Sequence, residues 1–182
     1  MKNILVITSS PRVKGNSNSL VQSFMEGAKE KGHNVMHFDA ANKKILPCTA
    51  CGLCWSKGKP CIFNDDSNLI EEMMFLADTI VFISPIYWYT FNAQMKLIQD
   101  KMYPYVSTKK PQSLNIKDAV LISCCHDDSM QTFSGAIETY KEMLKYMNWQ
   151  DKGQLLVKAV GHIGDVEKTD YLNEAFQLGE SL

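Results

Sequence analysis

Short runs of apolar, largely β-branched residues alternate along the chain with segments in which apolar residues recur every three or four positions. Runs of the first kind are typical of strands buried on both faces, and the second spacing is typical of amphipathic helices. The pattern predicts strands at 2–8, 34–38, 79–84, 119–124 and 155–160. It predicts helices around 20–28, 69–77, 92–102, 136–147 and 171–176.

Local signals predict where the first helix begins and ends. Ser17 or Asn18 is a candidate N-cap, because a short side-chain oxygen can accept from a free N–H of the first turn. Gly32 is a candidate C-terminal stop. Strands and helices alternate five times, which predicts an α/β fold with a parallel sheet and helices on both faces. No linker or repeat interrupts the pattern, so we expect a single domain over residues 1–182.

Composition and charge narrow the classes of partner. The chain has 182 residues, of which 45% are hydrophobic, and its formal net charge is −1. Such a chain can bury roughly 70% of its unfolded surface, so it needs no disulfides to fold. The near-neutral charge predicts no nucleic-acid partner, and no apolar run is long enough to cross a membrane. We expect a cytoplasmic protein whose six cysteines are thiols, redox groups or metal ligands.

Ligands of open parallel sheets bind beyond the carboxyl ends of the strands, where loops 9–18, 85–91 and 123–131 are expected. Loop 9–18 precedes a helix N-terminus, whose N–H groups and positive dipole end favour a phosphate. Ser9, Ser17 and Asn18 can add hydrogen bonds and Arg12 can neutralise charge. A solvated loop with an ordinary helix cap is the simpler alternative. Neither G-x-G-x-x-G nor a Walker loop occurs, which disfavours a Rossmann dinucleotide site and a P-loop site.

Loop 85–91 places several aromatic residues directly after a buried strand, among them Tyr87, Trp88 and Tyr89. Their flat faces suit a heterocycle, although such residues also cover cores and subunit contacts. In loop 123–131, His126 can contact a bound ring, but a surface histidine usually does not. A phosphate site beside an aromatic site fits a mononucleotide, and FMN fits best because its large ring needs three loops.

Three segments carry a resemblance to a known family. SSPRVKGNSNSL resembles the S-P-R-x-x-G-N-S/T phosphate loop of the NAD(P)H-dependent FMN reductases, a flavodoxin-like group. SPIYWYTFNAQMKLIQDK resembles that family's S-P-x-Y-W segment with its K-x-x-x-D-[RK] helix. CTACGLCWSKGKPCIFNDD is similar to a segment of the iron–sulfur flavoprotein branch and its close relatives. The three lie within residues 2–102, and the C-terminal third of the chain matches only in the order of strands and helices.

The resemblance implies a flavodoxin-like three-layer sandwich with a five-stranded parallel sheet of order 2-1-3-4-5. It implies FMN as cofactor, NAD(P)H as co-substrate, and a homodimer or homotetramer with the flavin near a subunit boundary. Direct hydride transfer needs no acid–base residue, so no catalytic residue is assigned. The implied phosphate contacts are Ser9, Arg12, Asn16, Ser17 and Asn18. The implied ring contacts are Pro85, Ile86, Tyr87 and Trp88, with residues near Cys125 closing one side.

Four cysteines are spaced C-x2-C-x2-C-x6-C, at Cys48, Cys51, Cys54 and Cys61. Three thiols at two-residue intervals with a later fourth can surround a cubane, and the spacing resembles the 4Fe–4S motif of iron–sulfur flavoproteins. Four thiolates also suit zinc. Reduced thiols without any metal are the third alternative.

Three functions remain open on the sequence. The leading hypothesis is an FMN-dependent oxidoreductase that passes electrons from NAD(P)H to a small acceptor, such as a quinone, a nitroaromatic or free flavin. The second is an electron carrier that takes electrons from ferredoxin through a 4Fe–4S cluster, although the near-neutral charge is unusual for a flavodoxin-type carrier. The third is a flavin-binding module with a regulatory role.

Overall fold

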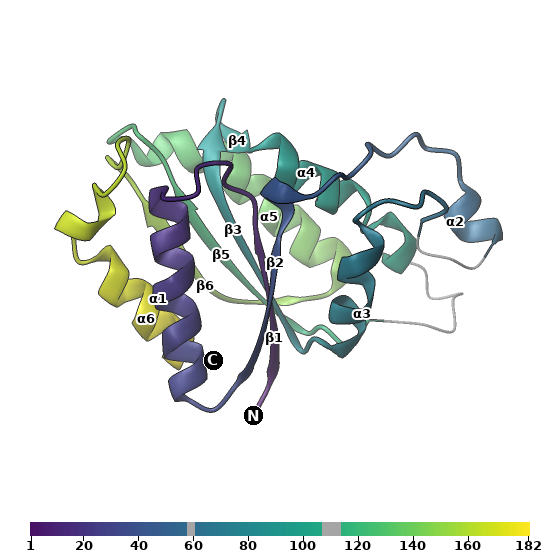
Figure 1. The fold of residues 1–182 in the computed structure, drawn as a ribbon, viewed down its shortest axis with the longest axis horizontal. Coiled ribbons are helices and arrows are strands. Elements are labelled where there is room, and N and C mark those ends of the chain that lie inside the picture. The colour runs from purple at the N-terminus through teal and green to yellow at the C-terminus, as the bar shows by residue number, and fades with distance from the viewer. Residues whose placement is uncertain (58–60, 107–113) are drawn as a thin grey trace.

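The computed structural model describes residues 1–57, 61–106 and 114–182. Five parallel strands form one sheet in the order β2-β1-β3-β5-β6, and the short β4 pairs antiparallel with the end of β3 (Figure 1). Counting only the parallel strands, this is the predicted order 2-1-3-4-5, and the flavodoxin-like fold is confirmed. The strands are β1 (Asn3–Thr8), β2 (Asn34–Asp39), β3 (Thr79–Tyr87), β4 (Thr90–Phe91), β5 (Asp118–Cys124) and β6 (Gln150–Val157).

Helices cover both faces of the sheet. Helices α1 and α6 pack on one face, and α3, α4 and α5 pack on the other (Figure 1). An apolar core lies on each face of the sheet, and successive residues of β1 point into them alternately. Ile4 and Val6 pack on the α1 side and Leu5 and Ile7 on the other side, as expected for a central strand. The helices are α1 (Asn16–Glu30), α2 (Leu53–Ser56), α3 (Asn68–Leu76), α4 (Ala93–Asp100), α5 (Ser134–Met147) and α6 (Tyr171–Glu180).

The first helix differs from prediction at its start and agrees with it at its end. Gly15 is the N-cap and the helix begins at Asn16, so the prediction of Ser17 or Asn18 as N-cap is wrong. No side chain caps this helix, which leaves its first N–H groups available. Gly32 has a φ of +77°, the left-handed conformation typical of a helix stop, so the predicted end is confirmed.

The last strand and a short hairpin were not placed correctly by the apolar pattern. Strand β6 covers Gln150–Val157, not 155–160, because it lies at the sheet edge and its first half is largely exposed and polar. Strand β3 continues past the apolar run to Tyr87 and turns back through Trp88 and Tyr89 into β4. In the part of the chain that is described, no helix has the length and apolar character needed to cross a bilayer.

Candidate flavin and thiol sites

A cavity of about 120 Å³ lies beyond the carboxyl ends of the parallel strands. It brings together the three loops predicted to form a site, and it adds a fourth loop that follows β6. Its lining comprises Ser10, Arg12, Gly15, Asn16 and Ser17 from the first loop; Pro85, Ile86 and Tyr87 from the second; Cys124, Cys125 and His126 from the third; and Val160 and Gly161 from the fourth.

The loop after β1 holds the N-terminus of α1 open to this cavity. Gly15 N–H donates to the Arg12 carbonyl at 2.8 Å, and the Asn18 side-chain amide donates to the carbonyls of Arg12 and Val13, both at 3.0 Å. A Cβ atom on Gly15 would lie 3.0 Å from both Cβ and O of Arg12. Because the loop is this tightly wound, the first N–H groups of α1 and their positive dipole end are directed at one small volume.

Arg12 and Asn16 fasten the loop after β6 to the first loop. Arg12 Nη1 donates to the Gly161 carbonyl at 3.0 Å. Asn16 Nδ2 donates to the carbonyls of Val160 and His162, and its Oδ1 accepts from the N–H of Val166. The Asn16 side-chain amide is therefore used to hold the two loops together. Only the backbone N–H of Asn16 remains for the phosphate contact predicted for this residue.

Three of the predicted cofactor contacts do not line the cavity. Ser9 is fully buried, and its Oγ has no hydrogen-bond partner within the described ranges. Asn18 lines a separate cavity of about 580 Å³ on the β2 side of the loop. Trp88 is 92% exposed at the tip of the β3–β4 hairpin. The cavity does collect Arg12, Asn16, Ser17, Pro85, Ile86, Tyr87 and Cys125 from the predicted set.

The hairpin tip is held in an unusual backbone conformation. Trp88 and Tyr89 have φ values of +50° and +68°, a region that bulky side chains rarely occupy and that defines the tight turns of two-residue hairpins. Behind the tip, the buried Asn92 caps α4 by accepting from Met95 N–H, and its Nδ2 donates to the Ser9 carbonyl at 2.5 Å. The aromatic loop and the loop after β1 are thereby joined by one side chain.

Two thiols and an imidazole stand at the end of β5. The Cys124 Sγ lies 3.1 Å from Ser17 Oγ, and burial raises the pKa of this thiol to about 11. Burial also raises the pKa of Cys125, whose Sγ donates to the Asp127 carbonyl at 3.2 Å. Both thiols are therefore protonated at neutral pH, which suits packing or hydrogen bonding and not nucleophilic attack.

Sequence reasoning missed several residues of this cavity. Ser10, Gly15, Val160 and Gly161 all line it without having been predicted as contacts, whereas Cys124 lies among the residues near Cys125 that were expected at one side. The loop after β6 was missed because the apolar pattern predicted that strand to end at Val160, three residues beyond its actual end at Val157. The available signal for Gly161 was the position of a glycine directly after a predicted strand. The structure explains the glycine, because a Cβ atom there would lie 1.9 Å from His126 Nδ1.

A second cavity, of about 390 Å³, is lined by all four spaced cysteines, Cys48, Cys51, Cys54 and Cys61. The first two are exposed and the last two are half-buried. Ala50 and Gly52 have φ values of +54° and +68°, so left-handed turns separate the first three cysteines. Within the described residues, no three His, Cys, Asp or Glu side chains converge as they would around a single ion. Residues 58–60, inside this cysteine-rich segment, lie outside the described part.

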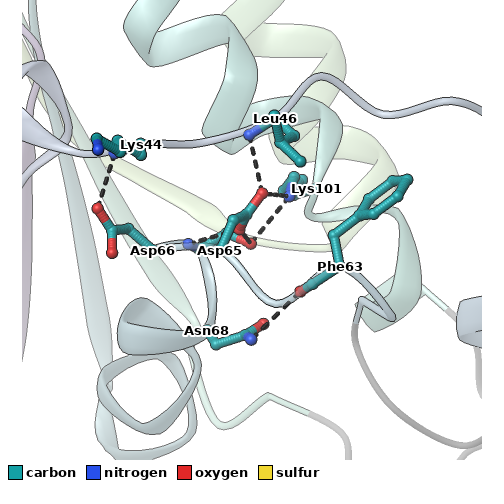
Figure 2. Close-up of polar contacts among 8 residues, drawn as sticks. Lys44, Leu46, Phe63, Asp65, Asp66, Asn68 and Lys101 are labelled. Carbon is teal, nitrogen blue, oxygen red and sulfur yellow. Dashed lines mark hydrogen bonds and ion pairs between the residues drawn. The ribbon is translucent and has the colours of Figure 1, made fainter.

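A buried ion pair lies beside the cysteine cavity, between the end of α4 and the segment that leaves the cysteines (Figure 2). Lys101 Nζ is 2.5 Å from Asp65 Oδ2, and the two side chains are only 6% and 5% exposed. Burial alone would raise the pKa of Asp65, but hydrogen bonds from Lys101, Ser67 and the Leu46 N–H outweigh it and lower the pKa to about 2. No pattern in the sequence indicates this pair, because its two members are 36 residues apart.

Solved structures with the same fold include redox enzymes. An NAD(P)H:quinone oxidoreductase from Methanothermobacter marburgensis superposes with a TM-score of 0.77 at 18% identity, covering 98% of this chain and 96% of that one. An azoreductase from Bacillus anthracis str. Sterne gives a TM-score of 0.76 at 15% identity and covers both chains completely. At these identities the likeness shows the fold.

Sequence comparison gives the family. An iron-sulfur flavoprotein of Archaeoglobus fulgidus is 33% identical over 99 residues, which is 54% of this chain and 44% of that protein. One of Methanosarcina thermophila is 34% identical over 95 residues, 52% of this chain and 49% of the relative. The chain thus matches about half the length of these relatives. The sequence profile of the NADPH-dependent FMN reductases matches residues 2–132. The chain therefore belongs to the NADPH-dependent FMN reductase family and has a flavodoxin-like fold.

Proposed function

We propose that the chain binds FMN at the cavity beyond the strand ends and reduces a small acceptor with electrons from NAD(P)H. The observation that carries this proposal is the convergence of an uncapped helix N-terminus, at Gly15 and Asn16, with the aromatic loop at Pro85–Tyr87 in one cavity. The helix N-terminus would bind a phosphate, and the adjacent aromatic loop would bind a flat ring.

The residues present fit the phosphate end of FMN. The Gly15 backbone leaves little room for a side chain at the helix start, and the Ser9 hydroxyl is buried beside the loop without a partner among the described residues. Arg12 adds positive charge at the cavity wall. We propose Ser9, Arg12, Asn16, Ser17 and Asn18 as the phosphate loop, with Asn16 and Asn18 acting chiefly by fixing its backbone.

The ring end is more open. The cavity of about 120 Å³ is smaller than sites that enclose a whole cofactor, which commonly exceed ~300 Å³. We therefore place the ring along Pro85, Ile86 and Tyr87, with Cys125 at its side and Trp88 at the solvent edge. Tyr87 is 43% exposed, which leaves room for a ring to cover it.

Bound FMN would supply hydride acceptance from NAD(P)H and electron delivery to the acceptor. The chain's own part is to bind the phosphate, orient the ring and leave one ring face open. Cys124 and Cys125 hold their protons at neutral pH, so neither supplies an acid or a base. Positioning then accounts for the rate, and a quinone, a nitroaromatic or free flavin is the proposed class of acceptor.

Comparing FMN with riboflavin tests this proposal, because the two differ only in the phosphate. We expect the purified protein to carry, or to take up, FMN with its visible absorbance, and to bind riboflavin at least about tenfold more weakly, as loss of charge-assisted hydrogen bonds implies. NAD(P)H should then bleach the bound FMN. Failure to take up FMN, or equal affinity for riboflavin, would contradict the proposed phosphate site.

The cysteine cavity favours a second candidate function. Four cysteines that line one cavity, at a sequence spacing suited to a cubane, would hold a 4Fe–4S cluster and make the chain an electron carrier from ferredoxin. Cys48, Cys51, Cys54 and Cys61 are the proposed ligands. Iron and acid-labile sulfide should be recovered from protein purified without oxygen, and ferredoxin should then reduce the flavin faster than NAD(P)H does. Absence of both elements from such a preparation would end this second proposal.

We further propose that the protein is a homodimer or a homotetramer. The exposed aromatic side chains of the hairpin, at Tyr87, Trp88 and Tyr89, lie next to the proposed ring site and would gain from burial against a second copy. The mass in solution measures this directly, and a strictly monomeric protein would contradict it.

A further inference from the structure

The cysteine loop, described over residues 47–57 and 61–64, joins the rest of the fold where its two ends meet, a junction that we call the neck. Lys44 N–H donates to Asp66 Oδ2 at 2.7 Å, and Asp66 N–H donates back to the Lys44 carbonyl at 3.1 Å. Leu46 N–H donates to Asp65 Oδ2 at 2.8 Å. The segments before and after the loop are therefore held together by two neighbouring carboxylates (Figure 2).

The neck is tied to helix α4 through Lys101. Its Nζ lies 2.5 Å from Asp65 and 3.1 Å from Ser67 Oγ. The remaining oxygen of Asp65 accepts from both N–H and Oγ of Ser67, at 2.9 and 2.5 Å. The carboxylate is thus held by hydrogen bonds from the loop's start, the loop's end and α4, which fixes the three segments relative to one another.

The same lysine belongs to the wall of the cysteine cavity. Lys101 and Phe63 both line that cavity with the four cysteines. The Lys101 ammonium lies 5.6 Å from the centroid of the Phe63 ring, within cation–π range. The position of Lys101 therefore affects both the neck and the cavity that the four cysteines line.

We propose that Lys101 and Asp65 are positioning residues of the cysteine site: their ion pair selects the loop conformation in which all four cysteines line one cavity. A buried ion pair gains little stability over an apolar replacement, and its best-attested use is to specify one arrangement among several. A role for this ion pair in electron transfer rests on the second function proposed above. The positioning of the cysteine loop by the ion pair rests only on the contacts described here.

Thiol labelling of the folded protein tests the proposal. The wild type, Lys101→Met, Asp65→Asn and Lys101→Arg variants are treated with a thiol-specific aromatic disulfide, and each cysteine's rate is read by peptide mass. Loss of the pair in Lys101→Met or Asp65→Asn should raise the rates of the half-buried Cys54 and Cys61 at least about tenfold, the factor that about 1.4 kcal/mol of local opening gives. Lys101→Arg should restore most of the protection.

Two further variants separate positioning from general destabilisation. Lys141→Met removes an exposed ion pair with Glu138 on α5 and should leave all rates unchanged. The double variant Asp65→Asn/Lys101→Met carries no unpaired buried charge, yet it should keep the fast rates, because the tie between neck and helix is still lost. Wild-type rates in the double variant, or in Lys101→Met with its fold intact by circular dichroism, would overturn the proposal.

Iron uptake distinguishes this proposal from the one it rests on. Reconstituted without oxygen using iron and sulfide, Lys101→Met should retain much less iron than the wild type, and Lys141→Met should match the wild type. If the wild type itself takes up no iron, the cluster proposal fails. The labelling rates still decide whether the ion pair positions the loop.

Discussion

Single atoms determine whether the four loops of the proposed flavin cavity can approach one another. At Gly161, a Cβ atom would lie 1.9 Å from Nδ1 and 2.7 Å from Cγ of His126, so any side chain there would require the His126 ring to move. The neighbouring Val160 and His162 carbonyls are held by Asn16, so this loop cannot easily retreat from the imidazole.

Gly161→Ala should therefore weaken FMN binding about tenfold by pushing His126 into the cavity, a cost within the usual range for overpacking. The measurement is a fluorescence titration of apoprotein with FMN. The double variant Gly161→Ala/His126→Ala should recover most of the affinity, because the colliding ring is gone. Equal loss in the single and double variants would show that the strain lies in the backbone and not in the imidazole.

Contacts between helices show the same dependence on absent side chains. Helices α1 and α6 cross so closely that a Cβ on Gly27 would lie 2.1 Å from the Phe176 carbonyl oxygen, and one on Gly179 would lie 2.2 Å from that of Phe24. Both atoms in the way are backbone, so neither can rotate aside.

Gly179→Ala should therefore destabilise the fold by about 2–3 kcal/mol, despite the better helix propensity of alanine. The free energy of unfolding in urea measures this, with the exposed Asn173→Ala on the same helix as the control. A neutral or stabilising effect at Gly179 would mean that the two helices can separate at little cost.

In the β3–β4 hairpin, the aromatic residues beside the proposed ring site lower the stability of the turn that carries them. Two consecutive aromatic residues with positive φ each cost on the order of 1 kcal/mol relative to residues suited to that region. Replacing Trp88-Tyr89 with Asn-Gly should raise the free energy of unfolding by about 1 kcal/mol. The same change should raise KM for an aromatic acceptor, if Trp88 borders the ring site as proposed. Unchanged stability would show that the turn is not strained.

At the scale of the whole molecule, the sheet and its site were predictable because they follow from periodic burial. Runs such as Ile4–Ile7 specify central strands, and the parallel order then places the loops after β1, β3 and β5 at one edge. The polar edge of β6, the hairpin at Trp88 and the tie between Asp65 and Lys101 left no such pattern. Each depends on a contact between residues that only the assembled fold makes neighbours.

The Asp65–Lys101 pair also predicts how the molecule responds to acid. The pKa of Asp65 falls from 3.8 to about 2 on folding, so the unfolded chain binds this proton more tightly than the native chain does. The resulting stabilisation, about 2 kcal/mol, is fully present above pH 4 or so and is lost as the pH falls toward 2.

The difference in free energy of unfolding between wild type and Asp65→Asn, measured in urea, should therefore be constant from neutral pH down to about 5 and shrink below about 4. Asp128→Asn, which removes an exposed partner of Lys158, should give a small difference at every pH, as expected of a surface pair. A wild-type advantage over Asp65→Asn that persists undiminished toward pH 2 would mean that the Asp65 carboxyl keeps its hydrogen bonds when protonated. In that case the neck of the cysteine loop would depend on the shape of the side chain and not on its charge.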